Sequence, residues 1–214
     1  MFIGAINPVV QGFLAREAAA FDHRLAVIGC SGNFTSEAVL TQHSRVREIH
    51  SNDVSFYSCL AGNFLAHTPM DFEVVDPAFE WLLPFLNSDA ERLASIMVLL
   101  DVLAFEKVDK SEHNRRMFQA HQQQFGDLVA KTVAKIQSTP IRLTSFFAGD
   151  VFEHFKRFAD RADAIFCCYA PTYVGGYEKM YKRLHEIVRW NEPTYAMLDD
   201  AARDALVAWI VLRC

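Results

Sequence analysis

The apolar run Leu25–Gly29 (LAVIG) constrains the fold of this chain more than any other segment. No polar side chain interrupts the run, which suits a strand covered on both faces, the usual environment of a strand in a parallel sheet. The run ends in glycine, and we expect a polar turn over 30–33 (CSGN) and then a helix capped by Thr35 or Ser36. A strand, a tight turn and a helix in this order predict a βα unit.

Strand and helix patterns alternate along most of the chain. Short apolar or β-branched runs predict further strands at 46–50, 72–75, 141–147, 164–169 and 194–198. Runs of helix formers predict helices at 8–21, from 51–55 to about 67, at 151–158, at 178–189 and from 199 onward. Such alternation predicts an α/β fold with a mostly parallel sheet flanked by helices.

Residues 78–137 differ from the rest, because they contain almost no glycine and only Pro84 interrupts their helical pattern. They predict two or three helices. We therefore expect one α/β domain made of residues 1–77 and 138–214, interrupted by a helical insertion over 78–137.

The composition excludes several classes of protein. The chain has 214 residues, of which 51% are hydrophobic, enough for a full core and too many for a disordered chain. No uncharged apolar run reaches the ~18–20 residues of a membrane span, and the N-terminus lacks the basic start of a signal peptide. We expect a cytoplasmic protein with no membrane partner.

The formal charge of −5 is unevenly distributed. Residues 106–190 hold 14 basic and 10 acidic side chains, whereas the rest of the chain holds 7 and 16. Net acidity disfavours a nucleic-acid partner, because Lys and Arg neutralise the phosphates. The basic segment nevertheless leaves DNA open as a partner.

The five cysteines and eight histidines do not indicate a metal site. The cysteine count is odd, no CxxC pair occurs, and no HExxH or HxxxH spacing is present. We expect reduced, mostly buried thiols and no metal.

Two turns that follow predicted strands are candidate ligand contacts. The turn Gly29–Gly32 lets a ligand approach the backbone, and Asp53 follows Gly32 by 21 residues, near the spacing at which an acidic side chain binds a ribose diol. Gly149-Asp150 places a second acid at the end of a strand. The first turn lacks the full GxGxxG pattern, which disfavours a dinucleotide. Tight turns with helix-capping aspartates explain the same residues without a ligand.

The apolar run 164–168 leads into a loop rich in proline and tyrosine, residues 169–177 (YAPTYVGGY). Three tyrosines on one loop suit stacking on a base or contact with a cation. Tyrosines that simply cover the end of the sheet are the alternative.

The order of these motifs resembles that of the Dam-like S-adenosylmethionine-dependent adenine-N6 DNA methyltransferases. Four blocks, VIGCSGNFTSEAVL, HSNDVSFYSCLAG, FFAGDVFEHF and FCCYAPTYVGGYEKMYKRL, are similar to those of antirestriction adenine methyltransferases of phages and mobile elements. The resemblance spans roughly residues 5–198. It implies a Rossmann-like methyltransferase fold, S-adenosylmethionine as cofactor, DNA as partner and 78–137 as the region that recognises the target.

The resemblance also implies roles for individual residues. Seven correspond to contacts with the cofactor's methionine, ribose and adenine: Gly29, Cys30, Ser31, Gly32, Asp53, Asp150 and Val151. Five correspond to the catalytic loop and its border: Tyr169, Ala170, Pro171, Thr172 and Tyr173. Asn7 and Pro8 are weaker candidates for the methionine end.

The loop departs from the DPPY-type pattern of the family. Tyr169 replaces the usual Asp, Asn or Ser, Ala170 replaces the first proline, and Thr172 replaces the aromatic residue. A phenol is a weaker hydrogen-bond acceptor than a carboxylate. Two alternatives to a DNA methyltransferase therefore stay open: a binding module of the same fold that acts on DNA or a host defence protein, and a methyltransferase for a small molecule or a protein.

The chain ends in the apolar run 208–212 (AWIVL). We expect this run to be buried, and a homodimer is one way to cover it. Sheets of this family continue with further strands after the motif-bearing ones, so a C-terminal truncation is a second expectation.

Overall fold

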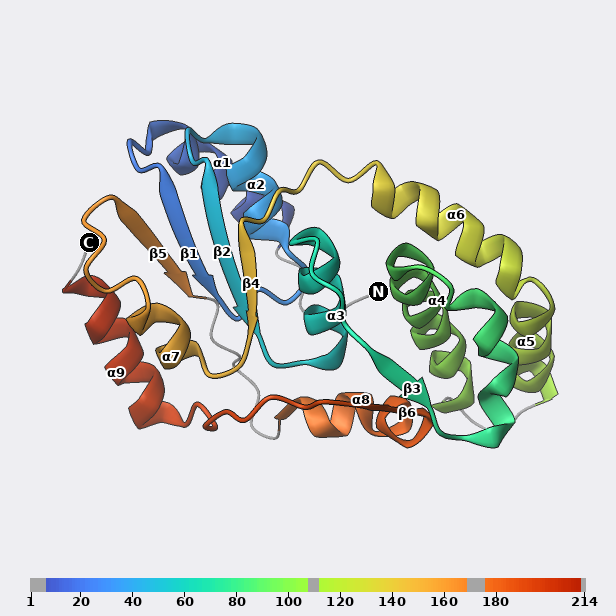
Figure 1. Ribbon diagram of the computed structural model, residues 1–214. Coiled ribbons are helices and arrows are strands. Elements are labelled where there is room, and N and C mark those ends of the chain that lie inside the picture. Colours follow the sequence, from blue (N-terminus) through green and yellow to red (C-terminus); the bar gives the residue numbers. More distant parts are fainter. Residues whose placement is uncertain (1–6, 108–111, 169–175, 213–214) are drawn as a thin grey trace. The chain divides into compact units, whose positions relative to one another are not determined.

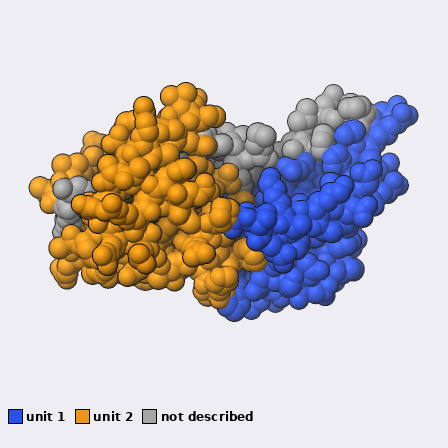
Figure 2. All heavy atoms as spheres, turned by 90° about the horizontal axis from the view of Figure 1, so that it is seen from above, with its two compact units in different colours: residues 1, 69–139, 177–191 blue, residues 2–68, 140–176, 192–214 orange. Residues whose placement is uncertain are grey.

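The computed structural model describes residues 7–107, 112–168 and 176–212 (Figure 1). The chain divides into two compact units, which Figure 2 colours separately. Unit 1 consists of residues 1, 69–139 and 177–191, and unit 2 of residues 2–68, 140–176 and 192–214. The chain therefore enters unit 1 twice.

Unit 2 is built on a four-stranded parallel sheet, which confirms the predicted fold class. Its strands are β1 (Leu25–Gly29), β2 (Glu48–Asp53), β4 (Ser145–Ala148) and β5 (Ala164–Cys168), in the order β4-β2-β1-β5. Gly29 pairs with Cys168, and Asp53 pairs with Ala148. Because every neighbouring pair is parallel, the four carboxyl ends meet at one edge.

Helices cover the sheet on both faces (Figure 1). They are α1 (Pro8–Ala20), α2 (Thr35–His43), α3 (Phe56–Leu65), α7 (Val151–Lys156) and α9 (Asp200–Val211). Neighbouring side chains of β4 point to opposite faces of the sheet. Phe146 contacts Gly62 of α3, and the Phe147 ring stacks on His154 of α7 with 6.0 Å between centroids.

The core between the sheet and helices α7 and α9 is apolar. It contains Leu25, Val27, Val151, Phe155, Ala164, Phe166 and Leu206. The Trp209 ring of α9 packs against it, with centroids 5.2 Å from Phe166 and 5.8 Å from Phe155. Full burial of such side chains contributes ~1.5–3 kcal/mol each, so these contacts, rather than helix propensity, hold α9 on the sheet.

Side-chain caps fix the start of two helices where the sequence predicts a start. The Asn7 carboxamide oxygen accepts a hydrogen bond from Val9 N (2.8 Å), and Pro8 occupies the first turn of α1. Asp199 accepts a hydrogen bond from Ala202 N (2.8 Å) at the start of α9. Each cap satisfies an N–H group that the helix itself leaves unpaired.

The predicted cap of α2 is wrong, because neither Thr35 nor Ser36 caps this helix. The N-cap residue is Phe34, in the left-handed conformation with φ 56° and without a side-chain cap. The Phe34 ring is buried and lies 6.0 Å from the Phe146 ring, centroid to centroid. This burial offsets the roughly 1–2 kcal/mol that the left-handed conformation costs.

Unit 1 is mostly helical. It contains the 3-10 helix η1 (Pro77–Phe85) and helices α4 (Asp89–Lys107), α5 (Glu112–Gln123), α6 (Phe125–Gln137) and α8 (Gly176–Ile187). The two or three helices expected over 78–137 are therefore α4, α5 and α6, preceded by η1. The short strands β3 (Phe72–Val74) and β6 (Val188–Trp190) pair antiparallel in the same unit.

Aromatic residues form part of the core of unit 1. The buried Phe125 ring lies edge-on to Trp81 and Phe85, with centroids 4.9 Å and 5.3 Å away. Arg183 pairs with Asp76 (3.4 Å), and its guanidinium lies 5.1 Å from the centroid of the Phe79 ring. Both features connect the 3-10 helix to the later helices of this unit.

Three strand predictions need correction. The strand predicted at 72–75 is present as β3, but it lies outside the parallel sheet and pairs with β6, where the sequence predicts the end of a helix. Residues 194–198 contain no strand. β2 continues to Asp53, so residues 51–53 extend a strand, and the predicted helix begins later, at Phe56 after its cap Ser55.

The expected burial of the apolar run 208–212 is wrong for a single chain. Trp209 and Ile210 pack against the core, but Val211 is 68% exposed and Leu212 is 82% exposed. Val207, one turn earlier, is 55% exposed. One face of α9 meets the sheet and the opposite face does not.

Within the described residues, no helix has the length and apolarity to cross a bilayer.

Candidate functional site

The carboxyl edge of the parallel sheet brings the sequence-predicted turns together. β2 and β4 lie on one side of β1, whereas β5 lies on the other. Such a change of direction in the strand order leaves a crevice outside the carboxyl ends, where open α/β sheets bind ligands. Cys30, which follows β1, and Cys168, which ends β5, border this position.

The turn Gly29–Gly32 is held by β2 and α3. Ser31 N donates a hydrogen bond to Asn52 O (2.9 Å), and the Ser58 hydroxyl donates to Gly32 O (2.9 Å). Cys30 and Gly32 both adopt the left-handed conformation, with φ 58° and 56°. The backbone therefore changes direction twice within three residues, and its shape is fixed by neighbouring elements.

Gly29 and Gly32 are glycines for different reasons. A Cβ on Gly29 would lie 2.4 Å from Val151 Cγ2 and 2.9 Å from Phe155 Cζ, so α7 occupies the space of a side chain. A Cβ on Gly32 would meet no atom of the described chain within 4 Å. The space beside Gly32 is open, which permits close approach of a ligand to the backbone.

We expect alanine to act differently at these two glycines. Gly29→Ala overpacks the contact between β1 and α7 and should lower the free energy of unfolding by about 3 kcal/mol. Gly32→Ala should cost about 1 kcal/mol, through its left-handed φ alone. Urea denaturation measures both, with Gly12→Ala in the exposed part of α1 as a control that loses no stability. Equal losses at both positions would contradict the packing role of Gly29.

Asp53 ends β2, and its carboxylate supports the turn. Oδ2 accepts a hydrogen bond from Gly32 N (2.8 Å), and Oδ1 accepts from Val54 N (2.8 Å) and Ser55 N (2.9 Å). Burial raises the pKa of Asp53, although these N–H groups oppose the rise. A carboxylate has about four acceptor positions; these N–H groups occupy three, and the fourth lies on Oδ2 of a side chain that is 2% exposed.

Asp150 caps α7 and holds the segment before α9. Oδ1 accepts hydrogen bonds from Phe152 N (2.8 Å) and Glu153 N (3.3 Å), and Oδ2 accepts from Ala196 N (3.0 Å). The capping role that the sequence left open is therefore present. Val151, which follows, is buried against Gly29.

The pKa of the Cys30 thiol reflects the acidic groups near it. Its pKa is raised well above the ordinary value, first by a hydrogen bond with Cys168, then by burial and by the charges of Cys168, Asp53 and Asp150. Neither lysine nor arginine is among the described groups that affect this thiol most. The edge disfavours added negative charge and therefore favours a neutral or cationic ligand.

A buried carboxyl group that sequence reasoning missed lies behind the turn. Glu37 of α2 is fully buried, and its Oε1 accepts a hydrogen bond from the Ser51 hydroxyl (2.9 Å). Burial raises the pKa of Glu37 to about 7, and the nearby Ser31 and Ser51 hydroxyls oppose the rise. Glu37 Oε2 and Ser31 Oγ are buried, and neither makes a hydrogen bond of normal geometry within the described part of the chain.

Asn52 is a second residue that sequence reasoning missed. Its side-chain amide donates to Phe147 O (2.9 Å) and Gly149 O (2.7 Å), which fixes the turn before Asp150 relative to β2. The only sequence signal for Asn52 is its place before Asp53. Its partners are 95 and 97 residues away, which no local pattern reveals.

The predicted catalytic residues Tyr169, Ala170, Pro171, Thr172 and Tyr173 lie outside the described residues. β5 ends one residue earlier, at Cys168, on the edge that holds the glycine turn. Asn7 and Pro8 begin α1, where the Asn7 side chain is occupied as its cap. The role of these seven residues stays a prediction.

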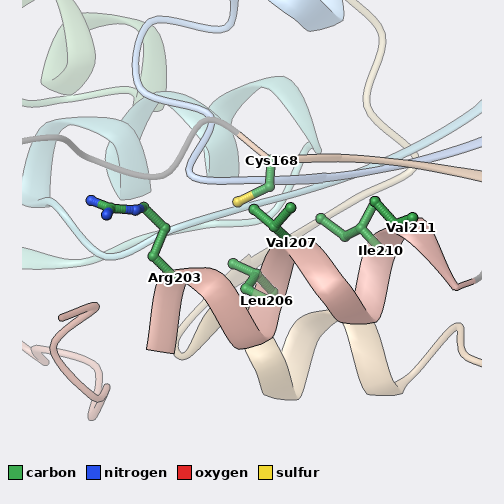
Figure 3. A pocket seen from close by; sticks show the side chains of 6 residues that line it. All are labelled: Cys168, Arg203, Leu206, Val207, Ile210 and Val211. Atoms are coloured by element: carbon green, nitrogen blue, oxygen red, sulfur yellow. The ribbon is translucent and has the colours of Figure 1, made fainter. Parts of the chain in front are cut away.

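A cavity of about 230 Å³ lies between the end of β5 and α9 (Figure 3). Its lining consists of Cys168, Arg203, Leu206, Val207, Ile210 and Val211. This volume is below the ~300–1,000 Å³ of typical small-molecule sites, and the lining contains no acidic residue. The cavity therefore suits one apolar side chain better than a nucleoside cofactor.

The arrangement at the edge offers open space beside the backbone and acidic groups close by. Open space beside Gly32 and the Asp53 carboxylate that supports the turn lie together, and the buried Ser31 hydroxyl of the same turn lies near the Glu37 carboxyl group. Backbone and hydroxyl groups there can orient a ligand, and the surrounding acids favour a cation. The described part of the edge contributes binding groups, and the raised pKa of Cys30 keeps its thiol protonated and weakly nucleophilic.

The comparisons with known proteins identify one family. A family model described as Phage DNA Adenine Methylase-like domain 1 matches residues 2–213. No curated protein and no solved structure matches the chain. The family match spans both units, including the helices of unit 1.

Proposed function

We propose a function from the family to which this chain belongs, the phage DNA adenine methylase-like family. The chain transfers the methyl group of S-adenosylmethionine to N6 of adenine in DNA. The family match over residues 2–213 carries the proposal. It gains support from the glycine turn with Asp53 behind it, at the edge where open α/β sheets bind ligands.

The residues at the sheet edge would hold the cofactor. The turn Gly29–Gly32 with Cys30 and Ser31 would border its methionine and ribose, and Asp53 Oδ2 would accept a ribose hydroxyl. Asp150 with Val151 would face the adenine. When bound, the cofactor supplies an electrophilic methyl group on a sulfonium. The acidic groups around Cys30 suit that positive charge.

The loop 169–173 would receive the target base. The amine of adenine is a weak nucleophile because its lone pair is delocalised into the ring. Tyr169 and the carbonyl groups near Pro171 would accept hydrogen bonds from its N–H groups, and Tyr173 would stack on the base after it leaves the duplex. Holding the amine in line with the methyl group contributes much of the remaining rate.

DNA is the proposed substrate, and protection of phage or mobile-element DNA from host restriction is the proposed role. Residues 106–190 carry most of the basic side chains and include the loop 169–173. We propose that the helices of unit 1 recognise the target sequence. Phosphate contacts by Lys and Arg would make binding weaken steeply with salt.

Cofactor binding and methyl transfer are tested in two steps. Titration with labelled S-adenosylmethionine should give saturable binding, and incubation with unmodified DNA should give N6-methyladenine by mass spectrometry. Asp53→Asn should weaken cofactor binding at least tenfold, because it removes the free acceptor on Oδ2. Absence of binding at near-millimolar cofactor would refute the proposal.

A second candidate function follows from Tyr169, Ala170 and Thr172, which depart from the DPPY-type pattern. The chain would then keep the cofactor site and the DNA contacts without transferring the methyl group. Tight cofactor binding and salt-dependent DNA binding, together with no methylated product, would favour this binding module. A methyltransferase for a small molecule or a protein predicts no salt-dependent DNA binding.

A further inference from the structure

The turn Gly29–Gly32 is backed by a carboxyl group that is poorly paired for its depth. Glu37 is fully buried, and among the described residues only the Ser51 hydroxyl makes a hydrogen bond of normal geometry to it. A buried charge is costly unless it is paired. Among the described groups that affect Glu37 most, its ionised form therefore has no counter-charge.

The neighbours of Glu37 place it next to the turn. Ser31 of the turn lies near its carboxyl group, and its buried hydroxyl makes no hydrogen bond of normal geometry within the described chain. From β2, Ser51 donates to Glu37, and the Asp53 carboxylate acts on it as a like charge. These are the groups that affect Glu37 most, and none of them is positive.

We propose that Glu37 is the buried counter-charge for a cationic ligand at the glycine turn, which makes the site prefer S-adenosylmethionine to its demethylated thioether product. The inference rests on the proposed function, because the cation in question is the sulfonium of the cofactor. The sulfonium is positive and the thioether is neutral, so only the sulfonium gains from a nearby carboxylate. Glu37 is a positioning residue that acts across the turn, and it also favours release of the product.

This preference depends on pH. Below pH 7 the buried carboxyl group is mostly neutral, and above it mostly ionised. A bound cation favours the ionised form and so lowers the pKa of Glu37. If that pKa falls by about one on binding, the affinity for the sulfonium relative to the thioether rises roughly fivefold between pH 6 and pH 8.

The test measures the dissociation constants of S-adenosylmethionine and S-adenosylhomocysteine by calorimetry at pH 6 and pH 8. Both ligands carry the same amino and carboxylate groups, so the ratio of their affinities cancels the titration of those groups. We expect the ratio to rise roughly fivefold in the unmodified protein. In Glu37→Gln, the ratio should be lower at pH 8 and independent of pH.

Glu37→Gln is a suitable variant, because glutamine matches the size of the carboxyl group and its neutral state. Its binding of S-adenosylhomocysteine should be unchanged, which shows that the turn is intact. Glu17→Gln, on the exposed side of α1, is the matched control and should retain the pH-dependent ratio. A ratio independent of pH in the unmodified protein, or a pH-dependent ratio in Glu37→Gln, would overturn the role of Glu37 alone. No binding of either ligand would overturn the proposed function and this inference with it.

Discussion

Asp53→Ala is expected to lower the free energy of unfolding by about 3–5 kcal/mol and to abolish cofactor binding. The substitution removes the acceptor of three N–H groups, those of Gly32, Val54 and Ser55. Each buried N–H group left without a partner costs ~1–3 kcal/mol. Recovery of the cost of burying the Asp53 carboxylate offsets part of the sum. Urea denaturation monitored by circular dichroism measures the loss.

Asp53→Asn separates stability from binding. The Asn carbonyl oxygen can keep the bonds from Val54 N and Ser55 N, whereas its amide faces Gly32 N as a second donor. The expected loss is about 1–3 kcal/mol, so the variant stays folded, while cofactor binding falls at least tenfold. Asp22→Asn, whose carboxylate is 93% exposed in a pair with Arg45, should change neither quantity. An Asp53→Ala variant as stable as the unmodified protein would contradict the described hydrogen bonds.

The elements predicted well from the sequence are those whose signals are local. The apolar run of β1 has the bounds predicted, and α1 and α9 begin at their caps because Asn7 and Asp199 bond to N–H groups two or three residues later. The run of β5 ends in the structure at Cys168, within one residue of the prediction. Local burial and capping need no knowledge of distant partners.

The end of β2 could not be predicted in this way. Ser51, Asn52 and Asp53 look like the polar start of a helix, yet all three are buried in a strand. Distant groups compensate their burial, since Ser51 bonds to Glu37 and Asn52 to two carbonyl groups of the β4 region. A polar strand end of this kind is stable only when such partners exist.

The other corrections to the predicted strands have the same origin. Residues 72–75 and 194–198 both carry β-forming side chains, but strand formation depends on a neighbour in the sheet. β3 pairs with β6, where Glu73 lies opposite Arg189, 116 residues later in the chain. Residues 194–198 pair with no strand; instead, Asp150 accepts a hydrogen bond from Ala196 N, and Leu198 packs against the core of unit 2.

Half of the candidate site follows from one rule about parallel sheets. Carboxyl ends of neighbouring strands meet, so Gly29–Gly32, Asp53 and Asp150 were expected at one edge. Glu37 escapes that rule because it lies on a helix behind the turn, 14 residues before its partner Ser51. An acidic residue in a first helical turn usually stays in solvent, so its burial could be found only in three dimensions.

The contributions of Glu37 and His154 to the free energy of unfolding should largely cancel between pH 4.5 and 6.5, because burial shifts their pKa values in opposite directions. Burial lowers the pKa of His154 to about 4, so the folded chain binds fewer protons than the unfolded one and stability rises with pH up to about 6.5. Burial raises the pKa of Glu37 to about 7, so stability falls as pH rises from about 4.5 to 7. Each effect amounts to about 3 kcal/mol over its range.

Two variants should reveal the two opposing effects. In Glu37→Gln, only His154 of the pair still titrates, so the free energy of unfolding of this variant should rise by about 3 kcal/mol between pH 4 and 6.5. His154→Gln keeps a donor for the hydrogen bond that joins His154 Nε2 to His50 O (3.2 Å). Only Glu37 of the pair then titrates, so the free energy of unfolding of this variant should fall by about 3 kcal/mol between pH 4.5 and 7. Urea titrations at half-unit steps of pH measure both slopes. The double variant should lose both opposing slopes, since the two groups act through separate contacts. The pH dependence that remains comes from groups such as Asp53 and His50, whose pKa values burial also shifts. Two single variants with slopes of the same sign would show that either Glu37 or His154 is not buried as described.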